Sequence, residues 1–355
     1  MSTLRVTAEQ LTIVEHPNAD ALELAQVGLY RAVVAKGEYR TGEFAVYIPE
    51  QAVLPEPLVA ELGLTGRLAG GAANRVRAVR LRGELSQGIV CRPAVLAGTD
   101  LERASAADED FAGRLGITKW VPPVPISMSG DVESAPDLLP WTDIENLKRY
   151  PDIFAPGDLV TVTEKLHGTA CCLTYYAGSG AIHVTSKGLG SQRLALVESP
   201  GNLYWRAVRG HGLPQLAADL AGTLGATRVG IYGEVYGSGV QDLGYGLDAR
   251  GGLPGYAAFD VCAEIGGRLS WLDPAELPVG DLPLVPRLHH GPFDLDQVLA
   301  LARGKETVSG RGAHIREGVV VRTADGTYSP VIGGRAVAKV VSDAYLTRKG
   351  GTEYE

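Results

Sequence analysis

The sequence predicts an α+β fold in which a small β-barrel precedes a larger domain of mixed, mainly antiparallel sheets with flanking helices. Its 355 residues exceed the usual size of one domain. Short runs of alternating apolar residues at both ends of the chain indicate strands, and a proline-rich stretch separates these two groups. We therefore place the domains at residues 1–118 and 151–355, with residues 119–150 as a linker.

The composition excludes several classes of protein. Hydrophobic residues make up 45% and charged residues 21% of the chain, so it is neither disordered nor fibrous. No segment approaches the roughly 20 uncharged apolar residues of a membrane span, and the N-terminus lacks the apolar core of a signal peptide. We expect a cytoplasmic monomer without a membrane partner. The cysteines, Cys91, Cys171, Cys172 and Cys262, lack disulfide-framework or zinc spacing and are predicted to be buried thiols.

The first domain is predicted to consist of short strands. Apolar alternation places them at residues 22–27, 31–35, 44–48 and 85–91, separated by glycine-containing turns. Residues 94–118 have the apolar spacing of a helix. These elements predict a small barrel or sandwich.

Arginines are concentrated between residues 67 and 92, where six of them face a single acid, Glu84, and give a local charge of +5. Alternation with period 2 places Arg75 and Arg77 on one face, and Arg80 and Arg82 on the opposite face or at a bulge. Nucleic-acid contact by these four arginines is one interpretation. A solvated edge strand, protected from aggregation by its charge, is equally consistent with the pattern.

The second domain is predicted to mix strands with two helices. The prolines between residues 121 and 140 exclude a long helix there. Helices are expected within residues 203–224, as one amphipathic helix, and at 295–303. Strands are expected at residues 159–163, 171–175, 181–185, 229–232, 257–261, 318–321 and 337–341.

A lysine stands at the end of the first of these strands, in the segment Glu-Lys-Leu-His-Gly-Thr of residues 164–169. The glycine three positions after Lys165 suits a pocket in which the backbone approaches a ligand closely. Taken alone this spacing is weak, because residues 187–190 match it as well. By itself the motif is better explained by a surface lysine followed by a turn glycine.

Further elements follow in one order on successive predicted strands. Lys187 comes just after a strand, Glu234 and then Phe259 with Asp260 end strands, Glu317 opens a strand, and Lys339 lies within the last one. The order resembles that of the covalent nucleotidyltransferases, which include ATP-dependent ligases and capping enzymes. The segment around Lys165 is especially similar to nick-sealing RNA ligases of phages and RNA-editing complexes.

This resemblance implies roles for the individual residues. Lys165 would attack ATP to form a lysyl-AMP adduct, and Lys339 would clamp the α-phosphate and favour the neutral amine of Lys165. Glu317, with Glu234, would hold Mg²⁺ or Mn²⁺. The ATP-binding residues would be Glu164, Gly168, Lys187, Glu234, Phe259 and Lys339.

Each of these residues also has a simpler interpretation. Phe259 fits a core position, Glu234 and Glu317 fit exposed strand ends, and Lys339 fits a side chain that extends from the sheet toward water. His167 would orient a phosphate or a metal-bound water, or would only be held by backbone hydrogen bonds.

Two positions depart from the pattern of the RNA-editing ligases. Val341 replaces a second lysine of the last motif, so a further cation, Arg335 or Lys349, would share the phosphate with Lys339. Ala170 stands where close relatives have asparagine. Both departures concern how the phosphates and the metal are held and leave the nucleophile in place.

The first domain has a resemblance of its own. Residues 14–23 are similar to the opening of tRNA-binding OB modules, and an N-terminal OB-like barrel resembles a branch of bacterial and protist RNA ligases. We therefore expect an ATP-dependent RNA ligase that joins 3′-hydroxyl and 5′-phosphate ends of nicked or broken RNA, or of an RNA/DNA hybrid. The alternatives are a tRNA-like-binding protein with a decayed catalytic domain and a guanylyl transferase of the capping type.

Overall fold

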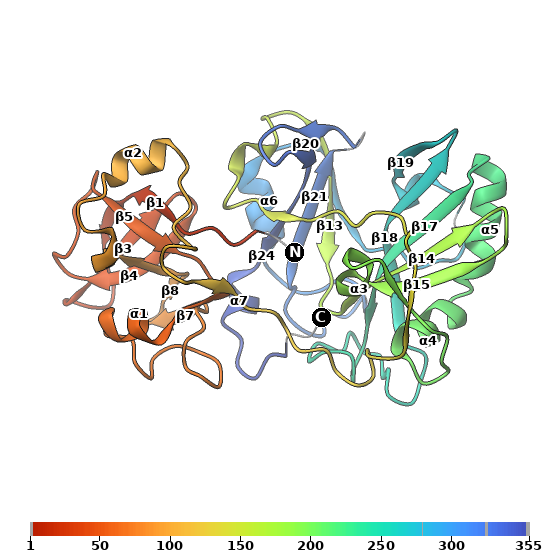
Figure 1. Ribbon diagram of the computed structural model, residues 1–355, viewed down its shortest axis with the longest axis horizontal. Coiled ribbons are helices and arrows are strands. Elements are labelled where there is room, and N and C mark those ends of the chain that lie inside the picture. Colours follow the sequence, from red (N-terminus) through yellow and green to blue (C-terminus); the bar gives the residue numbers. More distant parts are fainter. Residues whose placement is uncertain (1–2, 279, 324–325, 353–355) are drawn as a thin grey trace. The chain divides into compact units, whose positions relative to one another are not determined.

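The structure is a computed structural model that describes residues 3–278, 280–323 and 326–352 (Figure 1). The chain divides into two compact units. The first contains residues 1–121 and 346–348, and the second contains residues 122–345 and 349–355. Among the described residues, no helix combines the length and the apolar character needed to cross a membrane.

The first unit is built from short antiparallel strands. One sheet has the order β1-β5-β9 and another the order β2-β3-β4, while β7 pairs with β8 and β6 with β10. Its elements are β1 (Thr7–Gln10), β2 (Thr12–Glu15), β3 (Leu22–Val27), β4 (Tyr30–Ala35), β5 (Phe44–Ile48), β6 (Ala52–Val53), α1 (Glu56–Glu61), β7 (Val79–Leu81), β8 (Glu84–Ser86), β9 (Ile89–Cys91), the 3₁₀ turn η1 (Ala94–Leu96), α2 (Leu101–Ala106) and β10 (Thr118–Lys119).

Alternating burial explains how these strands form a core. In β4 the side chains of Ala32 and Val34 are buried and their neighbours are more exposed, as expected for a half-buried strand. The strand predicted at residues 85–91 is in fact two strands, β8 and β9. They are separated at Gly88, whose backbone has a φ of +82° and lies against Ile48 and Tyr47 too closely for any side chain.

The helix predicted across residues 94–118 was also too long. Only η1 and the six-residue helix α2 form there, and α2 begins after Asp100, whose side chain accepts a hydrogen bond from the backbone N–H of Arg103. Apolar residues beyond α2, such as Phe111 and Ile117, are buried in the same core without being helical.

The second unit contains a seven-stranded sheet, β11-β16-β15-β14-β17-β18-β19, and a five-stranded sheet, β12-β24-β21-β13-β20. All neighbours are antiparallel except β12 and β24. Its elements are β11 (Val132–Ser134), β12 (Glu145–Asn146), η2 (Pro151–Ile153), β13 (Leu159–Lys165), β14 (Thr169–Tyr176), β15 (Ile182–Ser186), α3 (Lys187–Ser191), β16 (Leu194–Leu196), α4 (Leu203–Gly210), α5 (Leu213–Leu224), β17 (Arg228–Tyr236), β18 (Gly255–Ile265), β19 (Arg268–Leu272), η3 (Pro274–Glu276), β20 (Arg287–Pro292), α6 (Leu295–Leu301), β21 (Gly318–Thr323), β22 (Tyr328–Ser329), β23 (Gly334–Arg335), β24 (Val337–Val341) and α7 (Asp343–Leu346).

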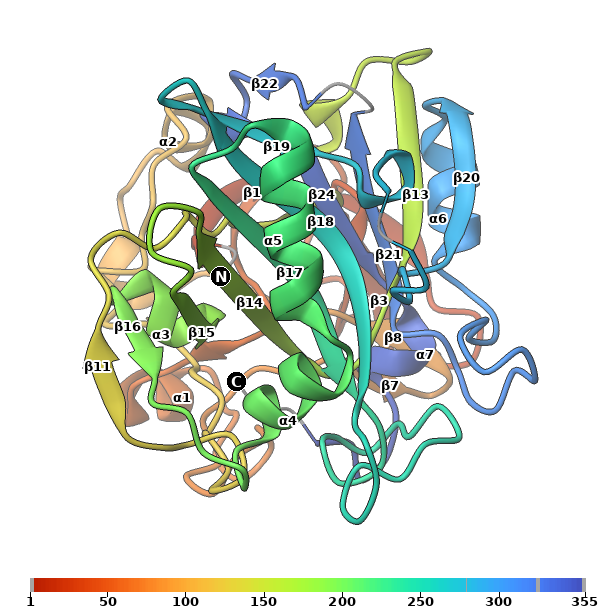
Figure 2. The same cartoon turned by 90° about the vertical axis from the view of Figure 1, so that its right-hand side faces the viewer.

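Helices α4 and α5 lie across one face of the seven-stranded sheet (Figure 2). The single helix expected within residues 203–224 is wrong, because the chain turns at Gly212, which has a φ of +64°. Pro214, in the first turn of α5, also favours a new helix start.

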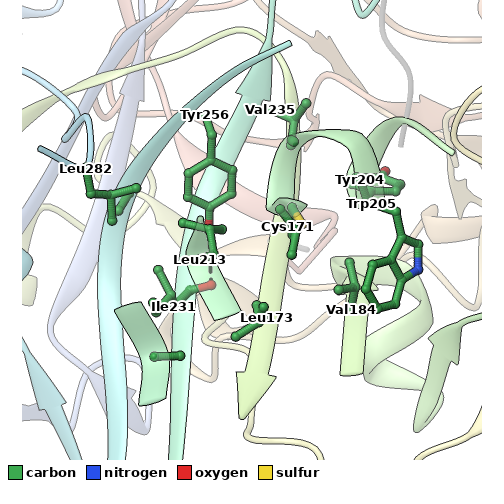
Figure 3. Close-up of a cluster of buried hydrophobic side chains, with 14 of the residues drawn as sticks. Cys171, Leu173, Val184, Tyr204, Trp205, Leu213, Ile231, Val235, Tyr256 and Leu282 are labelled. Carbon is green, nitrogen blue, oxygen red and sulfur yellow. Dashed lines mark hydrogen bonds between the residues drawn. The ribbon is translucent and has the colours of Figure 1, made fainter. Parts of the chain in front are cut away.

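Large side chains fill the space between these helices and the sheet (Figure 3). Trp205 from α4 and Leu213 from α5 pack with Ile231 and Tyr256 from the strands. The hydroxyl of Tyr256 donates a hydrogen bond to the carbonyl oxygen of Ile231 at 3.1 Å. Gly233 leaves the room that the Tyr256 ring occupies.

The proline-rich segment that the sequence predicts as a linker contributes to the second unit. Its strands β11 and β12 pair with β16 and β24. Met128, Leu139 and Leu147 from this segment are buried. The domain limits at residues 118 and 151 remain predictions.

Candidate active site

Lys165 and Glu317 meet at the end of strand β13, although they are 152 positions apart in the chain. Strand β13 pairs with β21 so that Lys165 lies opposite Gly318, the residue that follows Glu317. The Nζ atom of Lys165 donates a hydrogen bond to Oε1 of Glu317 at 2.7 Å. The Glu317 side chain is buried and that of Lys165 is 26% exposed, so the amine stays accessible from one side.

Glu234 is a third charged residue of this site. It lies on β17 opposite Ala170, and its carboxyl group is close enough to Lys165 and Glu317 for their charges to affect it. Burial raises the pKa of Glu234 to about 8, and Lys165 opposes this rise while Glu317 adds to it. The folded site therefore favours the protonated form of this carboxyl group more than water does.

Gly168 allows the turn between β13 and β14 to pack against β17. A Cβ atom at this position would overlap the carbonyl oxygen of Val235 and lie 2.9 Å from Cγ of Glu234. The carbonyl oxygen of Gly168 accepts a hydrogen bond from Gln241. The glycine is thus required by the protein's own packing, which brings Lys165 and Glu234 close together.

A pocket of about 210 Å³ opens within the second unit beside these residues. Six of the predicted site residues line this pocket. Gly168 is close to the lining residue Lys165 in the chain, and Glu317 contacts Lys165 directly. The six are Glu164, Lys165, Lys187, Glu234, Phe259 and Lys339. Strands of both sheets contribute, so the fold brings together residues from the whole length of the second unit.

Three of these residues have distinct local settings. Lys187 is the first residue of α3, and its Nζ lies 2.8 Å from Oδ1 of Asp143. Phe259 lies where the register between β17 and β18 shifts by one residue, and such a bulge redirects a side chain. Lys339 is half-buried on β24, opposite Val320 of β21.

Glu164 lines the pocket but is held mainly by other parts of the chain. Its Oε2 atom accepts hydrogen bonds from the backbone N–H of Thr307 at 2.9 Å and from the Thr307 hydroxyl at 2.6 Å. The Nε atom of Arg316 lies 3.4 Å from the same oxygen. Oε1 of Glu164 is buried without a hydrogen-bond partner among the described residues.

The carboxylates of the site suit a divalent cation that takes few protein ligands. Oε2 of Glu317 is buried and has no hydrogen-bond partner in the described part of the chain. No group of three or more His, Cys, Asp or Glu side chains is arranged around a metal position in the residues that the structure describes. Magnesium commonly uses one or two carboxylates together with water and substrate phosphates, so Glu317 and Glu234 fit such an ion.

The ring of His167 is held by side chains from two distant parts of the chain. Its Nε2 lies 2.7 Å from Oδ1 of Asp242, and its Nδ1 lies 2.8 Å from the hydroxyl of Tyr345. The ring is buried. These contacts fix the loop between Lys165 and Gly168.

Several residues that line the pocket were not among the predicted site residues. Arg335 forms a two-pronged ion pair with buried Asp260, and its guanidinium carbon lies 4.7 Å from the centre of the Trp271 ring. Arg322 lies 3.0 Å from Asp273 and donates a hydrogen bond to the Phe259 carbonyl oxygen. A polar residue at an alternate position of the apolar strand β21 was the available signal for Arg322.

The four arginines of the first unit do not form one surface. Arg75 is buried; its Nε donates a hydrogen bond to Gln51, and its guanidinium carbon lies 3.3 Å from the centre of the Trp120 ring. The prediction that Arg75 projects together with Arg77 is therefore wrong. Arg77 is half-buried, whereas Arg80 on β7 and Arg82 in the β7–β8 turn are exposed.

Comparison with known proteins agrees with this architecture. An RNA ligase family model matches residues 158–341, and an OB-fold domain model matches residues 5–93. A search of curated proteins gave no match. An apo variant of Naegleria gruberi RNA ligase has 25% identity and a TM-score of 0.76, with 98% of each chain covered.

Two further structures of the Naegleria gruberi enzyme are similar. The complex with pyrophosphate has 25% identity and a TM-score of 0.75, and covers 97% of this chain and 98% of the other. A variant solved with ATP and manganese has 24% identity and a TM-score of 0.76, with the same coverage. With an N-terminal OB-fold domain and a family model that matches more than half of its residues, the chain belongs to the RNA ligase family.

Proposed function

We propose that the chain is an ATP-dependent RNA ligase that joins a 3′-hydroxyl to a 5′-phosphate, at nicks in duplex RNA, through an AMP adduct on Lys165. The observation that carries this proposal is the 2.7 Å contact between Lys165 and Glu317 beside a pocket that also contains Glu234 and Lys339. A protein that only binds nucleic acid has no need of this set.

The first chemical step forms the adduct. Lys165 Nζ, after losing a proton, attacks the α-phosphorus of ATP; a P–N bond forms and the bond to pyrophosphate breaks. Glu317 Oε1 accepts a hydrogen bond from Nζ at 2.7 Å and holds the amine at the pocket. Lys339 would place a positive charge at the α-phosphate and oppose protonation of Lys165.

Two further displacements complete the reaction. An oxygen of the RNA 5′-phosphate attacks the phosphorus of the adduct, and Lys165 leaves with a proton. The 3′-hydroxyl then attacks the 5′-phosphate and expels AMP. A divalent cation, Mg²⁺ or Mn²⁺, held by Glu317 and Glu234, supplies positive charge to phosphate oxygens when it is bound.

The remaining pocket residues would bind the nucleotide. Phe259 is proposed to stack on adenine, and Glu234 and Lys187 to contact the ribose, as the resemblance implies. Glu164 and Gly168 would contribute by holding the loop between Lys165 and Gly168 in place. Structures of the Naegleria gruberi ligase with ATP and manganese support this choice of nucleotide and metal.

In the first unit we propose Arg77, Arg80 and Arg82 as RNA contacts. Arg80 and Arg82 are exposed on the β7–β8 hairpin. Contacts with phosphates position a duplex without reading its sequence. An RNA strand, alone or paired with DNA, is the expected partner.

The test is AMP capture. The purified chain is incubated with α-labelled ATP or GTP and Mg²⁺ or Mn²⁺, then run on a denaturing gel beside Lys165→Ala and the control Lys36→Ala, which alters an exposed lysine of the first unit. We expect a labelled band from ATP in the wild type and in Lys36→Ala only. A label that persists in Lys165→Ala contradicts the nucleophile assignment, a label from GTP alone favours guanylyl transfer, and no label favours the decayed binding protein.

A further inference from the structure

The segment of residues 303–315, between α6 and β21, is a loop with an unusual distribution of charge, and we refer to it as the basic loop. Arg303, Lys305 and Arg311 are all exposed. Its one acidic residue, Glu306, is buried. The outer surface of the loop therefore carries positive charge without a compensating carboxylate of its own.

Glu306 fastens the loop from the inside. Its Oε2 accepts a hydrogen bond from the backbone N–H of Ser309 at 2.8 Å, and its Oε1 accepts one from the backbone N–H of Ala313 at 2.7 Å and another from the Ser309 hydroxyl. A bridge between Lys305 and Ile315 closes the base of the loop. The backbone that carries the exposed cations is thus fixed without using them.

The basic loop is also fastened next to the lysine nucleophile. Thr307 donates two hydrogen bonds to Glu164, the residue before Lys165. Val308 packs against the cluster that contains Leu166, and His314 Nε2 accepts a hydrogen bond from the backbone N–H of Tyr245. These contacts place the loop beside the pocket and leave its charged side chains on the surface.

We propose that the basic loop binds the phosphate backbone of the RNA duplex beside the nick. This inference rests on the proposed function. Three separate cations on a fixed backbone suit a repeating row of phosphates, because each contact releases condensed counterions and adds to affinity without reading sequence. None of Arg303, Lys305 and Arg311 lines the nucleotide pocket. The loop would therefore act on RNA and not on ATP.

The experiment measures binding of a nicked RNA duplex by fluorescence anisotropy over a series of salt concentrations, with AMP capture as a separate readout. The variants are Arg303→Ala, Lys305→Ala, Arg311→Ala and the triple substitution. The control is Arg268→Ala, which removes an exposed arginine from the edge strand β19. Each loop substitution should reduce the slope of log affinity against log salt by about one, and the triple by about three, while AMP capture stays at the wild-type level.

The two proposals fail in different ways. If the triple variant and Arg268→Ala both keep the wild-type salt slope, or if the wild type captures AMP but does not bind the duplex, the proposal for the basic loop is overturned. If the wild type captures no AMP, the ligase proposal fails, and the salt slopes still report on the loop. Loss of AMP capture in the triple variant would contradict a role confined to RNA. Equal affinity of the wild-type protein for the nicked duplex and for an unrelated acidic protein would also overturn the proposal.

Discussion

Charged residues converge in the second unit and diverge in the first. Lys165 and Glu317 are 152 positions apart and meet at 2.7 Å. Arg75 and Arg77 are two positions apart, yet Arg75 is buried against Trp120 and Arg77 is only half-buried. Closeness in the sequence was therefore a poor guide to a shared surface, whereas strand pairing brought distant residues together.

The reason is the regularity of the backbone. Strands β13 and β21 pair without interruption over six positions, and buried valines such as Val160 and Val321 fix their register. Between Arg75 and Arg82, by contrast, Val79–Leu81 is the one stretch of strand, and Arg75 takes part in isolated bridges. Alternation with period 2 holds in the first case and fails in the second.

Lys165→Arg tests whether the meeting of Lys165 and Glu317 forms a reactive site. Arginine keeps a positive charge for Glu317 but stays protonated, so it cannot act as the nucleophile. We expect the fold to be retained and AMP capture to fall by roughly a thousandfold or more. The measurements are labelling with α-labelled ATP and thermal unfolding. Substantial labelling of this variant would remove Lys165 from the reaction.

A second test concerns the glycine that brings the strands together. Gly168→Ala should cost about 1–3 kcal/mol of unfolding free energy, because the added Cβ overlaps the Val235 carbonyl. The matched control is Gly178→Ala, since nothing lies within 4 Å of a Cβ at that position. Urea denaturation compares the two. Equal stabilities would mean that the β13–β14 turn does not need the close approach to β17.

A third test addresses the divergence of the arginines. Arg75→Ala removes a hydrogen bond and a stacking contact with Trp120, so we expect a loss of about 1–2 kcal/mol in unfolding free energy. Arg80→Ala, on the exposed β7, should leave stability within about 0.5 kcal/mol of the wild type and should weaken RNA binding. If Arg75→Ala and Arg80→Ala instead have the same stability and the same RNA affinity, the two arginines are equivalent and the contrast disappears.

A fourth test uses the pH dependence of Glu234. Its folded pKa of about 8 is above the ordinary value of 4.5, so its contribution to stability is complete below about 4.5 and is lost as pH rises through 8. Without nucleotide and metal, the free energy of unfolding of the wild type should fall across this window relative to that of Glu234→Gln. The fall should be at most about 1.4 kcal/mol for each pH unit. Thermal unfolding of both proteins from pH 5 to 9 measures the difference. Parallel curves would show that folding does not raise the pKa of Glu234.

Much of the fold could be predicted from local patterns. The strands β3, β5 and β24 lie where apolar alternation or β-branched residues placed them. The errors occurred where glycines redirect the chain, as at Gly88 and Gly212, because a turn of one or two residues hardly alters the apolar pattern around it. The α+β class and the N-terminal OB-fold domain were confirmed.

The candidate active site could also be predicted only in part. The reactive and charged residues from Lys165 to Lys339, and their order along the chain, could be read from the amino-acid sequence, because residue type and strand periodicity are local properties. The burial of Arg75, the ion pair between Arg335 and Asp260, and the hydrogen bonds from the basic loop to Glu164 were visible in the folded chain alone. Those outcomes depend on contacts between residues far apart in the chain, and the register and burial that create such contacts are set by packing of the whole unit.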